Sequence, residues 1–449
     1  MRLLLSTLVF CLSLFNPELF AESILFKNSN IVSMKSEAVD EKQDLLVIDG
    51  VISSIQKTGH ISVGEDTFII DATDKFLMPG LSEMHAHVPG DKDLETRNHY
   101  LYLYLINGIT TIRGMLGDPS HLVLRKELAQ GKTAGPRLIT SGPSLNGNSI
   151  ISVKQAKKMV QQQAKAGYDF LKLHPGLSKE EFIAIADEAN KFNIPFGGHV
   201  SDDVGLELTF AKRQATIDHL DQFFRPLFAD IHADKQQDPQ QFFGINFVPY
   251  IDKSKIKHFA HFFSESNSWL VPTETLMDNL ANEITAEELA DRDEMKYVSA
   301  SLVNSWKNAK KGFNAPKEIK QGFLKYRAEL LKAIQKNNGK ILLGSDAPQI
   351  FNVPGFSIHR ELELMVRSGL SPFQALRTGT VNAAKFFNES DKAGTLEVGK
   401  RADIVVLSKN PLTDIKNTKT IQGVLHKGIW INQDSIDRYL KNYLKRPSN

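Results

Sequence analysis

Short apolar runs, many of them ending at a polar and chemically active residue, alternate with stretches of helical periodicity along most of this sequence. The runs have the composition of buried parallel strands, and residues 153–166, 179–192 and 316–337 carry apolar side chains at helical spacing. Repeated alternation of strand and helix predicts an α/β fold, here a (β/α)8 barrel. In such a barrel, residues far apart in sequence converge where the strands end at the carboxyl face.

Residue types that bind metals stand at the ends of these runs. His85 and His87 are separated by one residue, so in a strand both imidazoles lie on one face. Neutral imidazole is the commonest protein ligand for zinc-like metals. Four further candidates belong to later runs: Lys172, His199, His219 and Asp346. Each residue also has an interpretation without metal. The histidines could be hydrogen-bonded residues of the core, the lysine could be solvated or snorkelling, and the aspartate could form a turn.

The ordered set resembles the amidohydrolase superfamily, in the binuclear-metal branch that includes prolidase-like Xaa-Pro dipeptidases and relatives of imidazolonepropionase. Nearly the whole chain after its N-terminal leader takes part in the resemblance. The motifs that carry it are Met78-Pro79-Gly80-Leu81 before His85-Ala86-His87, Gly108-Ile109-Thr110-Thr111-Ile112-Arg113, Phe170-Leu171-Lys172-Leu173, Gly198-His199, Ile217-Asp218-His219, Gly344-Ser345-Asp346 and the tail at 394–403.

The resemblance implies two divalent metal ions, expected to be Zn²⁺, bridged by an N6-carboxylated Lys172. His85, His87 and Asp346 would hold one metal, and His199 and His219 the other. A plain lysine amine would be repelled by two cations, whereas a carbamate offers two anionic oxygens. A hydroxide that bridges the metals would attack the substrate carbonyl, and Asp346 would carry the proton to the leaving nitrogen.

Substrate contacts are expected from four residues at or beyond strand ends: Arg113, His174, Tyr250 and His359. Arginine suits a substrate carboxylate because its fork bonds both oxygens. Residues 222–263 are rich in phenylalanine pairs and have two interpretations. They form either a helical lid above the site or surface helices that pack their aromatic side chains inward.

The two ends of the chain lie outside the barrel pattern. Strand-like runs occur at 24–32, 45–55 and 68–71, with an Asp49-Gly50 hairpin turn, and again at 403–407 and 423–431. We therefore expect residues 22–78 and 394–449 to form one small β-sandwich domain, as the resemblance implies, with the barrel at 79–393.

The first 21 residues read as a secretory signal peptide. Arg2 precedes an apolar run at 3–15 that is too short to span a bilayer, and Ala21 is a candidate cleavage point. Cleavage there would remove Cys11, the single cysteine of the chain, so no thiolate ligand would remain. A secreted or periplasmic protein without a membrane anchor is expected.

The 449 residues suffice for one large and one small domain, and a net charge of +2 gives no reason to expect a nucleic-acid partner. The favoured function is metal-dependent hydrolysis of a carbon–nitrogen bond in a small substrate, such as a dipeptide or an N-acyl amino acid. Alternatives are hydrolysis of a cyclic amide, as in imidazolonepropionase, deamination at one metal, and a non-catalytic binding protein. Whether the chain forms a homo-oligomer stays open.

Overall fold

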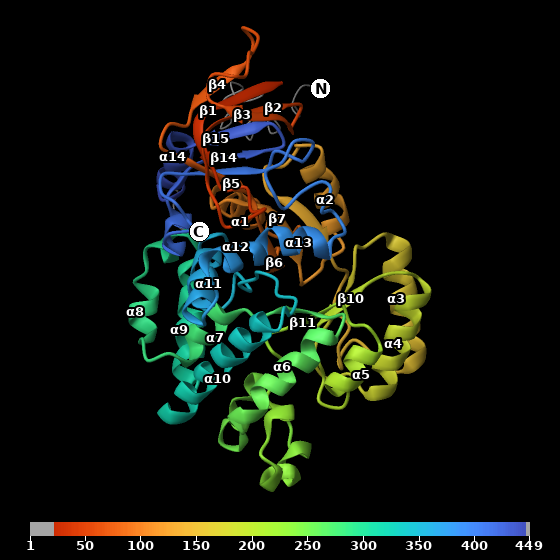
Figure 1. Ribbon diagram of the computed structural model, residues 1–449. Coiled ribbons are helices and arrows are strands. Elements are labelled where there is room, and N and C mark those ends of the chain that lie inside the picture. The colour runs from red at the N-terminus through yellow and green to blue at the C-terminus, as the bar shows by residue number, and fades with distance from the viewer. Residues whose placement is uncertain (1–21, 446–449) are drawn as a thin grey trace.

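The computed structural model describes residues 22–445 of this chain, and the signal peptide predicted at residues 1–21 lies outside them. The described part is an α/β structure, with a sheet built from both ends of the chain at one side and strands alternating with helices in the remainder (Figure 1). Among the described residues, no helix is long and apolar enough to cross a membrane.

Seven short strands in the middle of the chain run parallel to their neighbours and form two sheets. The first sheet contains β6 (Leu81–Ala86), β7 (Ile109–Gly114) and β8 (Arg137–Thr140). The second contains β9 (Leu171–Leu173), β10 (Phe196–Gly198), β11 (Thr216–Asp218) and β12 (Trp269–Val271). These strands are almost entirely buried, which explains their nearly continuous apolar character.

Isolated bridges connect the two sheets. Ser141, after β8, bridges Phe170, before β9. On the other side, residues 340–347 lie between β12 and β6, because Ile341 bridges Leu270 and Ala347 bridges Ala86. The carboxyl ends of the strands therefore lie at the same end of this part of the molecule.

Helices follow most of the strands and cover the outside. In chain order they are α1 (Leu94–Ile106), α2 (His121–Ala129), α3 (Val153–Ala166), α4 (Lys179–Lys191), α5 (Gly205–Ala211), α6 (Ile256–Glu265), α7 (Glu274–Ala281), α8 (Ala286–Ala290), α9 (Ala300–Gly312), α10 (Lys317–Lys336), α11 (Phe356–Arg367), α12 (Pro372–Gly379), α13 (Val381–Phe386) and α14 (Gln433–Tyr443). Local signals set their ends: α4 starts at a capping box of Ser178 and Glu181, and α3 stops at Gly167 in the left-handed region. The three helices predicted from periodicity are confirmed as α3, α4 and α10.

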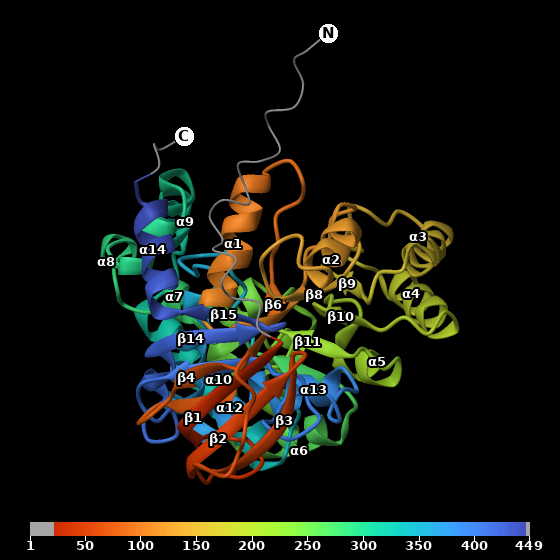
Figure 2. The same ribbon diagram turned by 90° about the horizontal axis from the view of Figure 1, so that it is seen from above.

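Strands from both ends of the chain pair in one sheet. The members are β1 (Ser23–Ile31), β2 (Asp40–Ile48), β3 (Val51–Lys57), β4 (Phe68–Asp71), β5 (Phe76–Pro79), β13 (Ile404–Leu407), β14 (Ile421–His426) and β15 (Ile429–Asn432). They are ordered β15-β14-β13-β5-β1-β2-β3, and β4 pairs with β1. The antiparallel pairing of β5 with β13 joins the two ends, which lie together in Figures 1 and 2. The Asp49-Gly50 hairpin is confirmed, and the strands of both ends belong to one hydrogen-bonded sheet, which curves so that the ring of Phe26 in β1 lies 5.5 Å from that of Trp430 in β15.

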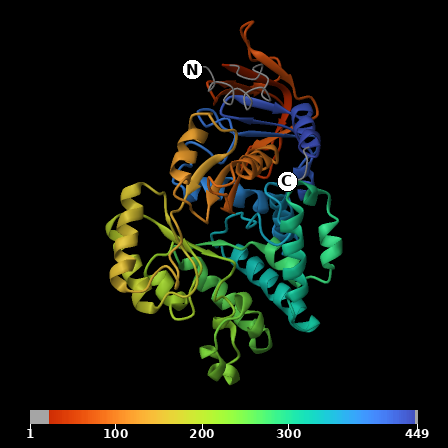
Figure 3. The ribbon, with the colours of Figure 1, turned by 180° about the vertical axis from the view of Figure 1, so that it is seen from behind.

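Residues 222–263, which we call the aromatic segment, follow β11. They contain the 3₁₀ helices η3 (Arg225–Leu227), η4 (Asp230–Gln237), η5 (Phe242–Tyr250) and η6 (Lys253–Lys255) before α6. In Figure 3 this segment lies at the end of the molecule opposite to the sheet made from both chain ends. Its phenylalanines at 223, 224, 228, 247, 259 and 263 are buried, as the inward-packing interpretation predicts, whereas Phe242 and Phe243 are only half-buried.

Candidate metal centre

Side chains from four strand ends meet around one cavity. His85 lies in β6 and His87 directly after it, His199 and His219 follow β10 and β11, and Asp346 ends the segment that lies between β12 and β6. These five residues and His174 line a cavity of about 350 Å³, a size suited to a small ligand. The structure thus brings together residues that are spread over most of the sequence.

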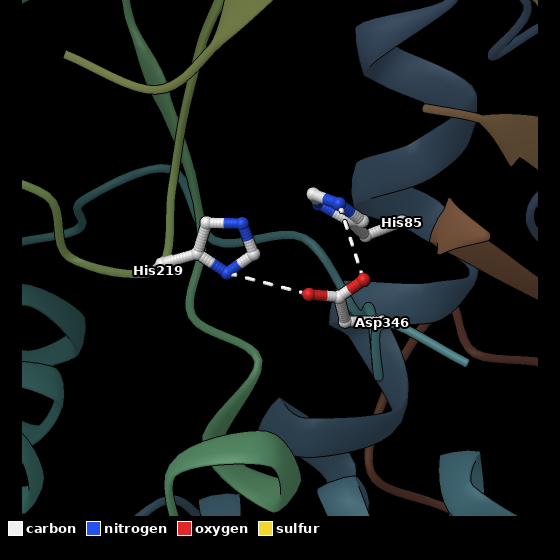
Figure 4. Close-up of side chains that lie close together, drawn as sticks. All are labelled: His85, His219 and Asp346. Atoms are coloured by element: carbon white, nitrogen blue, oxygen red, sulfur yellow. Dashed lines mark ion pairs between the residues drawn. The ribbon is translucent and has the colours of Figure 1, made fainter. Parts of the chain in front are cut away.

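Asp346 is the acidic centre of this group. Its Oδ1 lies 3.1 Å from Nε2 of His87 and 3.5 Å from Nε2 of His85, while its Oδ2 lies 3.9 Å from Nδ1 of His219. Figure 4 shows the carboxylate directed at both His85 and His219. Burial raises the pKa of Asp346 well above its usual range in the absence of a bound cation.

Outer contacts hold three of the imidazoles by their Nδ1 atoms. Nδ1 of His199 lies 2.7 Å from Oδ2 of Asp221, and Nδ1 of His219 lies 2.7 Å from the hydroxyl of Thr273. The amide of Gln349 donates to Nδ1 of His87 over 3.3 Å. Such contacts fix the orientation of a ring and leave Nε2 for a metal.

The donor set fits divalent metal ions. Nε2 of His87 and Oδ1 of Asp346 are buried without a hydrogen-bond partner, although they face each other. Ligand atoms of His85, His219 and Asp346 lie within 4.8 Å of one another. Burial lowers the pKa of His87 to about 3, so its ring is neutral and able to donate a lone pair. Nitrogen and oxygen donors of this kind suit zinc and similar ions.

Lys172 lies beneath the histidines and is completely buried. Its Nζ lies 3.4 Å from Oδ2 of Asp218, and burial lowers the pKa of the amine. Space for the side chain exists because residue 198 is glycine: a Cβ there would stand 2.9 Å from Cδ of Lys172. Gly198 also has φ +127°, which other residues adopt rarely.

Asp218 connects several of these groups, although no role was predicted for it from the sequence. Its Oδ2 lies 3.1 Å from Nδ1 of His85 as well as near Lys172, and its Oδ1 lies 3.5 Å from the guanidinium of Arg113. Burial alone would raise the pKa of this carboxyl, but the cationic Lys172 and Arg113 lower it below its usual range. A buried carboxylate at this point compensates the charge of its neighbours.

Glu83 ties β6 to the segment that carries Asp346. Its carboxylate accepts the backbone N–H of His85 at 3.0 Å and that of Ser345 at 2.8 Å, and it also accepts the Ser345 hydroxyl at 2.6 Å. Complete burial raises its pKa to about 7. The acid therefore sets the spacing between two of the strand ends that form the site.

The backbone at the site is strained. His219, Asp346 and Thr273 have φ of 67°, 63° and 50°, in the left-handed region that is unfavourable for residues with a Cβ. Such conformations persist where the surrounding structure imposes them, and they cluster at functional sites. Here the turn directly after a strand aims each of these side chains.

Three of the four predicted substrate contacts do not reach the cavity. Arg113 is buried below it, where it donates to the carbonyl of Met84 and to Thr216. His359 is buried in α11 against the hydroxyl of Thr418, and Tyr250 packs on Phe228 and His232. Their position near strand ends was the basis of the prediction, but their side chains point elsewhere. His174 does line the cavity, with its ring 5.0 Å from that of His199.

Comparison with known proteins identifies the family to which the chain belongs. The profile of the amidohydrolase family matches residues 76–431, and the chain belongs to this family, as the sequence motifs predicted. It is 32% identical to an L-hydantoinase of Paenarthrobacter aurescens over 143 residues, which is 30% of each chain. The alignment thus spans less than a third of that relative's length.

Two solved structures share the fold over nearly their whole length. A bottromycin amidohydrolase superimposes with a TM-score of 0.73 at 20% identity, over 94% of this chain and 90% of the other. A Xaa-Pro dipeptidase with methionine in its active site gives a TM-score of 0.67 at 18% identity, over 91% and 100%. At these identities the likeness concerns the fold.

Proposed function

We propose that this protein is a metal-dependent hydrolase that cleaves an amide carbon–nitrogen bond in a small substrate, with dipeptides and N-acyl amino acids as the first classes to examine. The observation that carries the proposal is the convergence of His85, His87, His199, His219 and Asp346 on one cavity, with Lys172 buried beneath them. Membership of the amidohydrolase family and the names of its relatives, which include a hydantoinase and a Xaa-Pro dipeptidase, support this class of reaction.

In this proposal His85, His87 and Asp346 would hold one divalent metal, His199 and His219 would hold the second, and Lys172, once carboxylated, would be a ligand to both. The bound metals supply activation of water and polarisation of the substrate carbonyl. Asp346 accepts the proton of the attacking water at its carboxylate and delivers it to the leaving nitrogen. The position of Asp346 supports that role, because its carboxylate lies close both to His87, proposed for the first metal, and to His219, proposed for the second.

The architecture around the site is proposed in the same terms. The seven parallel strands and residues 340–347 would make up a (β/α)8 barrel at 79–393, and residues 22–78 and 394–449 would form the small domain. The isolated bridges on both sides of the two parallel sheets support this view. We further propose that residues 1–21 direct secretion. The support is a charged residue near the start, followed by an apolar run.

A single-metal enzyme, such as a deaminase, is the second candidate. The observation that favours it is the compact trio of His85, His219 and Asp346, whose ligand atoms lie within 4.8 Å of one another and could hold one ion. In that case Lys172 would have no part in metal binding.

Metal content of a Lys172→Ala variant separates these candidates. We expect about two zinc ions per wild-type chain after reconstitution, and a loss of metal together with amidase activity in the variant. The matched control is Lys191→Ala, which removes a lysine whose side chain is 69% exposed. One metal per chain in both wild type and Lys172→Ala would contradict the binuclear proposal and favour the single-metal candidate.

The activity itself is tested with the reconstituted protein on dipeptides including Xaa-Pro, N-acyl amino acids and cyclic amides such as hydantoins. Release of an amino acid from the linear substrates supports the proposal. Turnover of the cyclic amides alone would indicate that the enzyme opens cyclic amides and does not cleave linear ones. Ligand binding without turnover of any member, in wild type and Asp346→Asn alike, would indicate a non-catalytic binding protein.

A further inference from the structure

One part of the cavity wall is apolar and comes from three segments that contribute no proposed metal ligand. Phe242 and Phe243 belong to η5 in the aromatic segment, and Phe313 follows α9. Together with Leu276 and Leu280 from α7 they line the same cavity as the histidines. We call Phe242, Phe243 and Phe313 the aromatic wall.

The aromatic wall is continuous with the candidate metal centre. The ring of Phe243 lies 5.0 Å from that of His219 and 6.0 Å from that of His199, between ring centroids. Phe242 continues the wall at 5.0 Å from Phe243 and 4.6 Å from Phe313. All three phenylalanines are half-buried, whereas most of the other phenylalanines in the aromatic segment are fully buried.

The conformation of the aromatic segment at this point is unfavourable by itself. Phe242 and Phe243 have φ of 34° and 55°, in the left-handed region that bulky residues avoid. Gln240 fixes the segment, since it accepts the backbone N–H of Gln222 at 3.0 Å and donates to Asp221 at 3.3 Å. Asp221 is the carboxylate that holds His199, so the wall and the histidine are positioned by one contact network.

We propose that the substrate carries a phenyl-sized apolar group that lies against Phe243 and Phe313, next to the amide bond to be cleaved. This inference rests on the proposed function and names its substrate class: small amides with an aromatic or bulky aliphatic substituent. Half-buried aromatic rings beside a polar centre offer an apolar ligand both area and a stacking surface. The 350 Å³ of the cavity hold one such ring in addition to an amide group.

Binding of two neutral amides tests the wall without requiring turnover. We expect isothermal titration of the metal-loaded protein to detect benzamide and to show acetamide binding at least about tenfold more weakly. Phe243→Ala and Phe313→Ala should each weaken benzamide binding several-fold. Phe262→Ala, which removes a 43% exposed phenylalanine of α6 outside the cavity, should leave it unchanged. Phe313→Ala keeps the test decisive if the strained position 243 does not tolerate alanine, as melting temperatures would show.

Kinetics then show where the aromatic group lies relative to the reaction. The substrates are N-acetylglycine, N-benzoylglycine and N-acetylphenylalanine, which all carry one carboxylate and differ in the presence and side of the ring. We expect at least one aromatic member to exceed N-acetylglycine by tenfold or more in kcat/KM, and Phe313→Ala to remove most of this preference through KM.

The two proposals fail in different ways. Equal binding of benzamide and acetamide, or benzamide binding that neither phenylalanine variant weakens, would overturn the aromatic wall as a specificity element even if the amides are hydrolysed. Selective benzamide binding with no hydrolysis of any amide would leave the wall in place and count against the proposed function.

Discussion

Arg113 is a fully buried cation beneath the cavity, held by the carbonyl of Met84 and by Asp218. Removal of the guanidinium would leave the buried carboxylate of Asp218 with one cation fewer, and a poorly compensated charge destabilises a low-dielectric interior. We predict that Arg113→Met lowers the free energy of unfolding by roughly 3–5 kcal/mol, measured by urea denaturation.

The control for that substitution is Arg367→Met, because the Arg367 side chain is 67% exposed and should contribute less than about 0.5 kcal/mol. A stable Arg113→Met protein with a raised KM for carboxylate substrates would instead restore the role that the sequence suggested for this residue.

Asp221 acts on the candidate metal centre through Nδ1 of His199. Loss of such an outer contact typically weakens metal binding by about 10- to 100-fold. We predict this reduction for Asp221→Ala, measured by competition with a zinc-binding dye. Asp187→Ala, at a carboxylate that is 56% exposed, serves as the control. Unchanged affinity in Asp221→Ala would mean that this contact does not contribute to metal binding.

At the level of single residues, the sequence predicted the group around the cavity well because each member stands where an apolar run ends. The roles of Asp221 and Thr273 could not be predicted, since they depend on which ring nitrogen faces them. Phe243 and Phe313 carry no signal that separates them from the many buried phenylalanines. Only the path of the chain shows that these two border the cavity.

At the level of elements, helix α11 is fastened to the start of α7 by Glu361. Its carboxylate accepts the backbone N–H groups of Glu274 and Thr275 at 2.9 and 2.7 Å. Burial and the nearby Glu274 raise the pKa of Glu361 to about 8 from an ordinary 4.5. Arg327 pairs with Glu274 and stays out of direct contact with Glu361.

Because the folded protein holds this proton more tightly than the unfolded chain, Glu361 contributes stability that is fully present below about pH 4.5. The contribution is lost as the pH rises toward about 8. We predict that between pH 5 and 8 the free energy of unfolding of wild type falls by roughly 2–4 kcal/mol more than that of Glu361→Gln, measured by urea denaturation. Parallel pH profiles for the two proteins would contradict the prediction.

The positions of helices and strands along the chain were easier to predict from the sequence than the pairing of strands with one another. The amphipathic patterns of α3, α4 and α10 are local, so the limits of these helices could be predicted within about one residue. Pairing is not local: nothing in the runs at 76–79 and 404–407 states that they are neighbours.

At the level of the whole molecule, metal binding is expected to stabilise the fold, because the ligands come together only in the folded chain. We predict that chelation with EDTA lowers Tm by several degrees and that added zinc restores it. Asp346→Asn should show a clearly smaller shift, since one proposed ligand is weakened. Equal shifts in both proteins would mean that chelation acts at another place.

The pairing of β5 with β13 also affects the order in which the chain can fold during its synthesis. β1 to β5 leave the ribosome first, but β13 is made only after all the strands and helices that surround the cavity. Until then β5 has a free edge and part of the apolar face of the first strands stays exposed to water. The native sheet is completed late, which would leave the newly made chain open to chaperones for most of its translation.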